Sequence, residues 1–102
     1  MRVFVAHSVR DRELVAAVVT LLREGGHEVF VAEEIAATGN LLSAISAGIR
    51  SADVLVAVVT GSNPNVFYEL GLAAGAGVPT LITARAGEPL PASCFTSTDD
   101  LA

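Results

Sequence analysis

The segment from Val54 to Val59 most strongly limits the folds open to this 102-residue chain. Its sequence, VLVAVV, is wholly apolar, and no polar residue alternates with the apolar ones. A strand with one face in water would show such alternation, so the pattern predicts a strand that is buried on both faces. Strands of this kind lie in the middle of parallel sheets that carry helices on both sides.

Strand patterns and helix patterns alternate along the chain. Short apolar runs at Val3–Ala6, His27–Ala32 and Pro79–Thr83 predict three more strands, and Phe30 is expected on the opposite side of its strand from Val29 and Val31. Three helices are expected between the strands. The first begins near the capping-box pair Ser8 and Asp11 and has an apolar stripe of Leu14, Val18, Leu21 and Leu22. The second ends at Arg50-Ser51 and has a stripe of Leu41, Leu42, Ile45 and Ile49. The third begins at Asn63-Pro64 and has a stripe of Val66, Leu70, Ala73 and Gly77.

Strand–helix alternation with short connections gives right-handed βαβ units and therefore a parallel sheet. We expect one domain over residues 1–102 with a flavodoxin-like, three-layer α/β/α fold and strand order 2-1-3-4-5. Ser93–Thr96 is the candidate for a short last strand, and the final helix is expected to be missing or truncated. An apolar sheet face near Phe95 would then lack a cover, and we expect a homodimer or a fused partner to cover it.

Charge and composition exclude several functions. The net charge is −5, and the six basic residues are all arginines that form no cluster, so a surface for polymeric nucleic acid is not expected. The single Cys94 excludes an internal disulfide, and His7 and His27 are too far apart in sequence to indicate a metal site. No apolar run approaches the roughly 20 residues of a membrane span, and the N-terminus does not resemble a signal peptide, so a cytoplasmic location is expected.

Glu69 is the only formally charged residue between Val54 and Ala84. A carboxylate in so apolar a segment is solvated on the wet side of its helix, is neutralised, or has a function, because removing a charge from water costs several kcal/mol. This fold binds ligands at the carboxyl ends of the strands, where the strand order reverses. The loops expected there are His7–Asp11, Glu33–Asn40 and Thr60–Asn65, and Glu69 would stand over the same crevice. The sequence contains no GxGxxG motif and no P-loop.

Several blocks of the sequence resemble a known family, the bacterial TIR-like (Toll/interleukin-1 receptor) domains. The blocks are Val3 to Asp11, Glu34-Ile35, Gly39-Asn40, Ile45 to Asp53, Asn63 to Gly71 and Gly77-Val78-Pro79. The block NPNVFYELG is also similar to one in nucleoside 2-deoxyribosyltransferases. The resemblance implies that Glu69 is the catalytic residue, that the reaction is cleavage of the N-glycosidic bond of NAD, and that residues 33–40 form the loop that mediates assembly and gates the site.

The chemistry of the leaving group favours NAD as the substrate. Cleavage passes through an oxocarbenium-like state that one carboxylate can stabilise, and nicotinamide departs from NAD as a neutral molecule. A neutral nucleobase generally needs a second acid, and the loop before Glu69 offers no aspartate. NAD would be a substrate, and no cofactor is expected.

The expected substrate-binding residues are His7 and Ser8 for phosphate, Phe30 for stacking on a ring, and Gly61, Ser62 and Asn65 near the ribose and Glu69. Packing or helix capping is an alternative role for these residues. Two other functions stay open. One is a non-catalytic interaction module that assembles through residues 33–40 or the C-terminal sheet edge, and the other is a nucleoside or nucleotide N-glycosidase.

Overall fold

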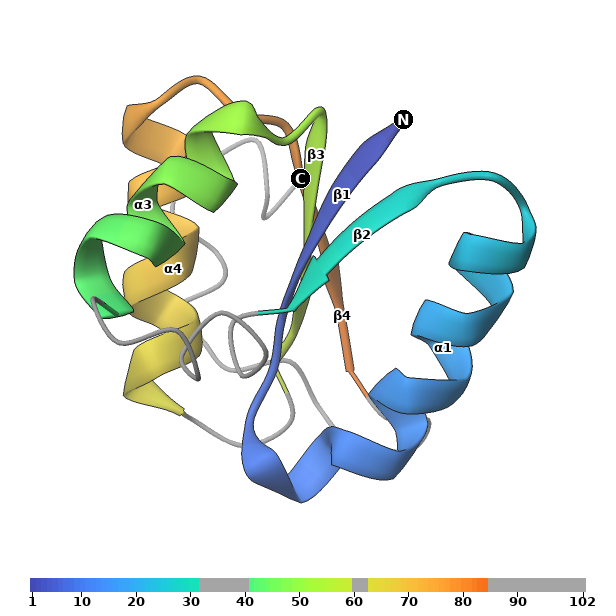
Figure 1. The fold of residues 1–102 in the computed structure, drawn as a ribbon. Coiled ribbons are helices and arrows are strands. Elements are labelled where there is room, and N and C mark those ends of the chain that lie inside the picture. The colour runs from blue at the N-terminus through green and yellow to red at the C-terminus, as the bar shows by residue number, and fades with distance from the viewer. Residues whose placement is uncertain (32–40, 60–62, 85–102) are drawn as a thin grey trace, which may run out of the picture.

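A computed structural model describes residues 1–31, 41–59 and 63–84, which form one parallel sheet with helices on both faces (Figure 1). The elements are β1 (Arg2–Ala6), η1, a short 3₁₀ helix (Val9–Asp11), α1 (Arg12–Glu24), β2 (Glu28–Val31), α3 (Leu41–Ser51), β3 (Val54–Val58), α4 (Pro64–Gly75) and β4 (Thr80–Thr83). The predicted strands and helices are therefore present, with ends shifted by one or two residues.

The strand order is β2-β1-β3-β4, and every neighbouring pair is parallel. Phe4 pairs with Phe30 on one side of β1 and with Leu55 on the other. This order confirms the predicted α/β class and the reversal of strand order at β1 and β3. The predicted fifth strand at 93–96 and the predicted loop at 33–40 lie outside the described residues.

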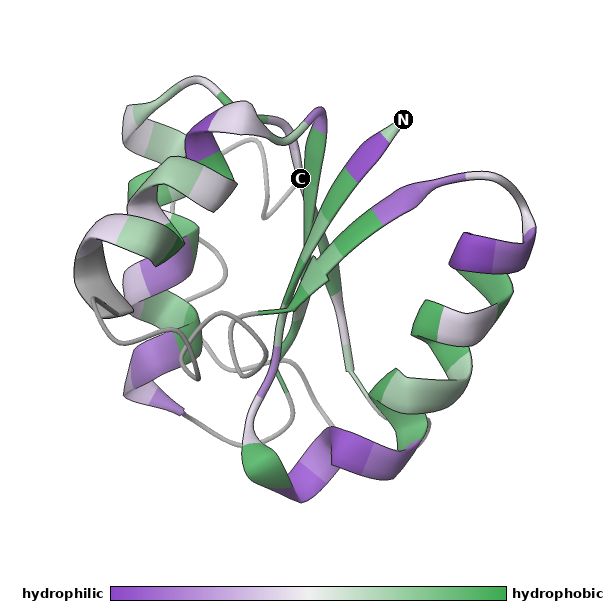
Figure 2. Ribbon diagram, in the orientation of Figure 1, coloured by the Kyte–Doolittle hydropathy of each residue, from purple (hydrophilic) through white to green (hydrophobic). Residues whose placement is uncertain are grey.

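Helices α3 and α4 cover one face of the sheet (Figure 1). The largest side chains in this part of the core, Phe4, Ile49 and Leu55, are fully buried, and Val66 and Ala73 pack against them from α4. Figure 2 shows apolar residues along the interiors of the strands, as expected for a sheet covered on both sides. Phe30 lies on this face, while Val29 and Val31 lie on the other, as predicted.

Helix α1 packs on the opposite face, but with a different stripe from the predicted one. Val15 and Val19 are buried against Val3 and Val5, whereas Leu14, Val18 and Leu21 are exposed. Of the predicted stripe, Leu22 packs against this core, and the prediction was wrong for Leu14, Val18 and Leu21 because α1 is apolar over much of its circumference. Periodicity alone does not reveal which part of such a wide apolar sector meets the sheet.

The predicted capping box at the start of α1 is also wrong. Asp11 occupies the cap position of α1 without a side-chain bond to the helix, and Ser8 caps η1 without one either. Instead, the Ser8 hydroxyl donates to Asp11 Oδ2 at 3.3 Å. The serine–aspartate spacing therefore indicates a contact between the two side chains, and the helix begins one residue after the pair.

Glycines with positive φ follow two of the helices. Gly26 has φ 89° after α1, and Gly77 has φ 73° after α4. In both places the next residue donates its N–H back to the last turn, from His27 to the Leu22 carbonyl and from Val78 to the Ala73 carbonyl. Left-handed backbone of this kind favours glycine, which explains the last glycine of the Gly-Gly and Gly-Ala-Gly sequences there.

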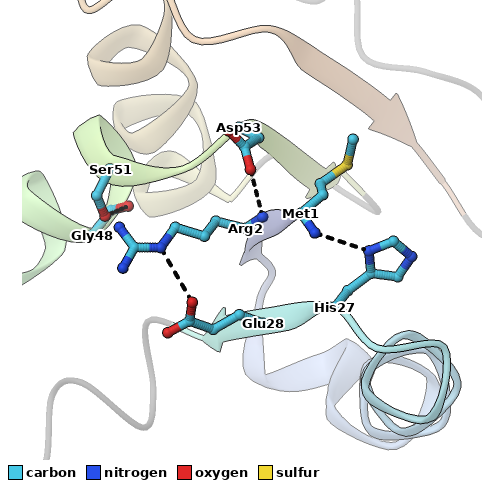
Figure 3. A network of polar contacts seen from close by, with 7 residues as sticks. All are labelled: Met1, Arg2, His27, Glu28, Gly48, Ser51 and Asp53. Atoms are coloured by element: carbon cyan, nitrogen blue, oxygen red, sulfur yellow. Dashed lines mark hydrogen bonds and ion pairs between the residues drawn. The ribbon is translucent and has the colours of Figure 1, made fainter.

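A polar network joins the amino ends of the strands (Figure 3). The Arg2 N–H donates to Asp53 Oδ2 at 2.6 Å, and Arg2 Nε lies 3.2 Å from Glu28 Oε2. These contacts tie β1 to the starts of β2 and β3. The network lies at the opposite end of the sheet from the loops expected to bind a ligand. None of the helices in the described segments has the length and apolar character needed to cross a membrane.

Candidate functional site

The start of α4 is fixed by Asn63 and Pro64, as predicted. Asn63 Oδ1 accepts hydrogen bonds from the N–H groups of Asn65 at 2.9 Å and Val66 at 3.3 Å. Pro64 occupies the first turn, where its missing N–H leaves no helical bond unmade. The chain enters α4 from the end of β3, so the helix begins at the carboxyl end of that central strand. Counted from the Asn63 cap, Glu69 lies in the second turn of the helix.

Glu69 is a buried carboxyl group, with only 7% of the residue exposed. Val66 and Ala73, one turn before and one turn after it, are buried on the same side of α4. The alternative of a solvated glutamate on the wet face of the helix is therefore wrong. Glu69 Oε2 is buried and has no hydrogen-bond partner. A buried oxygen without a hydrogen-bond partner costs about 1–3 kcal/mol of stability. Such groups are uncommon in folded proteins, and each one calls for an explanation.

Burial raises the pKa of Glu69 from 4.5 to about 7. The cause is desolvation, which disfavours the charged form of a carboxyl group. Near neutral pH the side chain is therefore divided between its protonated and ionised forms. A group in this state can stabilise positive charge when ionised and can donate a proton when neutral.

The turn after β1 carries His7, Ser8 and Asp11. His7 and Ser8 are half-buried, and His7 Nδ1 lies 2.7 Å from the Ser8 carbonyl oxygen. A carbonyl oxygen can only accept, so Nδ1 carries the hydrogen and Nε2 is left as the nitrogen open to other contacts. Asp11 is fully buried beneath this turn and accepts from the Ser8 hydroxyl.

Asp11 lies next to the candidate site, and the sequence did not indicate its side-chain contact with Ser8. The spacing of Ser8 and Asp11 predicted a helix cap, and that interpretation hid the contact between the two side chains. A buried carboxylate that is held inside a turn fixes the backbone of that turn. Its contact with the Ser8 hydroxyl joins the two ends of the turn that follows β1.

The remaining predicted substrate-binding residues are Phe30, Gly61, Ser62 and Asn65. Phe30 is half-buried in β2 and packs against the core beneath α3 and α4. Asn65 is exposed, and its N–H is used by the Asn63 cap. Gly61, Ser62 and residues 33–40 lie outside the described residues. Within the described part of the chain, the structure brings His7 and Ser8 together, and no hydrogen bond joins either of them to Glu69.

Two hollows in the surface lie away from Glu69. One of about 580 Å³ lies between α3 and α4 and is lined by Ser46, Arg50, Gly71, Leu72, Gly75 and Ala76. The other, of about 380 Å³, lies beside α1 and is almost wholly apolar. Residues 1–31, 41–59 and 63–84 contain no cluster of histidine, cysteine and carboxylate side chains that could hold a metal ion.

Comparison with known proteins gives a family and a fold. The model of the family described as "TIR domain" matches residues 3–97. No curated protein matches the sequence. The structure of the Clostridium botulinum CMP N-glycosidase BcmB is similar, with a TM-score of 0.70 and 19% sequence identity. The similarity covers 92% of this chain and 77% of that one, and at this identity it establishes a shared fold.

Proposed function

The chain belongs to the TIR domain family, and on this basis we propose that it cleaves the N-glycosidic bond between nicotinamide and ribose in NAD. The observation that carries the proposal is Glu69, a buried carboxyl group with an unpartnered oxygen, in the helix that follows the central strand. Its place near the carboxyl ends of parallel strands is where α/β sheets bind ligands.

In the proposed reaction, ionised Glu69 stabilises positive charge on the ribose. The C1′–N bond breaks, and its electron pair neutralises the pyridinium ring, so that nicotinamide leaves uncharged. Water then adds to C1′ and loses one proton, for which the carboxylate is an acceptor. The products are nicotinamide and ADP-ribose, and NAD is consumed as a substrate, so the reaction needs no further cofactor.

The turn after β1 supports the binding of a nucleotide at the same end of the sheet. His7 Nε2 is a polar group available to a phosphate, and Ser8, whose hydroxyl donates to buried Asp11, stays a proposed neighbour of that phosphate. Phe30 keeps its proposed role of packing beside a ring, and Gly61, Ser62 and Asn65 keep theirs near the ribose. A cytoplasmic location, where NAD is available, remains our expectation.

A second substrate class is favoured by a specific observation. The chain shares its fold with a CMP N-glycosidase, and a carboxyl group with a pKa of about 7 is partly protonated at neutral pH. The protonated form could donate a proton to a neutral nucleobase as it leaves. A nucleotide N-glycosidase is therefore the alternative enzymatic proposal. The non-enzymatic alternative is an interaction module, in which nucleotides have no effect on the protein or its assembly.

The test compares substrates and Glu69 variants. Purified protein is incubated separately with NAD, CMP and deoxycytidine, and released nicotinamide or cytosine is measured by chromatography. We expect nicotinamide from NAD, and we expect Glu69→Gln to lower the rate by roughly 10² or more, because it removes the charge that stabilises the transition state. Glu13→Gln, on the exposed side of α1, is the matched control and should leave the rate unchanged.

The outcomes separate the three functions. Cytosine release from CMP that depends on Glu69, without turnover of NAD, would replace the first proposal with the second. Release of base from deoxycytidine would indicate a nucleoside-specific enzyme. If none of the three substrates is cleaved at high protein concentration, or if Glu69→Gln retains full activity, only the interaction module remains.

A further inference from the structure

The imidazole ring of His7 is held at one of its two nitrogens by the neighbouring backbone. Nδ1 lies 2.7 Å from the Ser8 carbonyl oxygen and donates its hydrogen to that oxygen. The same oxygen accepts the N–H of Asp11 at 3.0 Å, which ties the carbonyl into the start of η1. The one N–H of a neutral His7 is therefore committed to Nδ1, and Nε2 carries only a lone pair.

This tautomer decides how His7 can meet a phosphate. The phosphate oxygens of a dinucleotide are ionised and accept hydrogen bonds, and so does the Nε2 lone pair of a neutral ring. In the other tautomer a neutral His7 would carry its hydrogen on Nε2 and could donate it to a phosphate. In this chain the contact needs a second proton on the ring, and a ring with hydrogen on both nitrogens is a cation.

We propose that His7 takes up a proton at Nε2 when a phosphate-bearing substrate binds, so that the site selects nucleotides over nucleosides and does so more strongly as pH falls. This inference rests on the proposed function, in which the turn after β1 meets the phosphate of a substrate of Glu69. The proton comes from solvent and returns to solvent when the phosphate leaves. It changes the affinity for the nucleotide, whereas cleavage of the bound nucleotide depends on Glu69.

Few charged groups lie at this end of the described part of the chain. In η1 and the first turn of α1 they are Arg10, Asp11, Arg12 and Glu13, of which Asp11 is buried and the other three are exposed. The strands carry no charged residue at their carboxyl ends, and α3 carries none in its first turns. Helix α4 contributes Glu69. Since Glu69 can also change its protonation when a substrate binds, the test has to remove it.

Calorimetric titration of the Glu69→Gln protein with NAD tests the proposal. This variant removes the titration of Glu69 and measures binding without any need for turnover. Titrations in buffers of different ionisation enthalpy count the protons taken up. We expect about one proton per NAD bound at pH 8, and an affinity that falls about tenfold per pH unit from 7 to 9. Nicotinamide riboside, which has no phosphate, should bind without proton uptake. CMP and cytidine form a second pair of probes above pH 7, where the phosphate of CMP is mainly a dianion.

Three variants, each combined with Glu69→Gln, show which residue takes up the proton. His7→Gln offers an amide donor at every pH, so its nucleotide binding should need no proton. His7→Asn keeps a donor for the Ser8 carbonyl but reaches no further, and it should weaken nucleotide binding at least about tenfold without changing nucleoside binding. His27→Gln is the matched control, because His27 is half-buried just before β2 and lies 3.4 Å from the N-terminal nitrogen (Figure 3). It should take up the same proton as its parent, and circular dichroism shows whether each variant is folded.

The nitrogen-15 NMR signals of the two histidine rings give a direct readout, and the same substitutions assign them. At pH 8 His7 should carry hydrogen on Nδ1 alone in the free protein and on both nitrogens with the nucleotide bound. Nucleotide binding without proton uptake, uptake that persists in His7→Gln, or no binding of either NAD or CMP overturns the proposal. Proton uptake at His7 in a protein whose wild type cleaves no substrate would support this proposal and reject the enzymatic function.

Discussion

At the scale of single residues, the structure assigns Glu69 an uncommon state. Its pKa of about 7 lies above the 4.5 of the unfolded chain, so the folded protein holds a proton that the unfolded chain has lost between these pH values. Stability therefore falls as pH rises from about 4.5 to about 7, and it does not recover above that range. The total loss is at most about 3 kcal/mol.

The variant Glu69→Gln tests this state, because the amide is neutral at every pH. We expect the free energy of unfolding of the wild-type protein to fall relative to that of the variant as pH rises from 5 to 8. Urea unfolding at several pH values measures the difference. Glu13→Gln, at an exposed position, should show no such trend. A constant difference between wild type and Glu69→Gln would contradict the burial of an uncompensated carboxyl group.

At the scale of elements, the sequence predicted those helix ends and strands that depend only on neighbouring residues. The cap and first turn of α4 follow from Asn63-Pro64, and the central strand follows from six apolar residues in a row. Apart from Leu22, the buried stripe of α1 could not be predicted, because Leu14, Val18 and Leu21 have the same helical spacing as the buried Val15, Val19 and Leu22. Only the position of α1 over β1 and β2 decides between them. The unpartnered oxygen of Glu69 likewise depends on contacts between distant segments.

The stripe that packs in the core can be checked by matched truncations in α1. Val15→Ala should lower the free energy of unfolding by about 2 kcal/mol, because it removes buried methyl groups and leaves a cavity. Leu14→Ala removes a larger side chain but should cost less, because Leu14 is partly in solvent. Both are measured by urea unfolding at low protein concentration. A larger loss for Leu14→Ala would restore the stripe predicted from sequence.

The cap of α4 gives a second prediction at this scale. Asn63→Ala removes the acceptor for two backbone N–H groups and should cost about 1 kcal/mol of stability. Because the cap sets the register of the helix that carries Glu69, we also expect the variant to have lower activity. Unfolding and NAD turnover are measured on the same preparation. Unchanged stability would show that the cap does not hold the helix.

At the scale of the whole molecule, α3 and α4 cover one face of the sheet, and α1 packs on the other face over β1 and β2. The sequence predicts a homo-oligomer, in which folding and association are linked, so we expect the melting temperature to rise with protein concentration. Differential scanning fluorimetry at about 1 and about 100 μM measures this effect. Identical melting curves for the wild-type protein at both concentrations would contradict the linkage.

The central claim is that the buried carboxyl group of Glu69 cleaves a nucleotide at its N-glycosidic bond. The most direct measurement is nicotinamide release from NAD under single-turnover conditions, with protein in excess, as a function of pH. We predict a rate that rises with pH through about 7 and then levels off, as Glu69 ionises, and that is lost in Glu69→Gln at every pH. A rate that is independent of pH between 5 and 9, or equal in the wild-type protein and Glu69→Gln, would contradict the account.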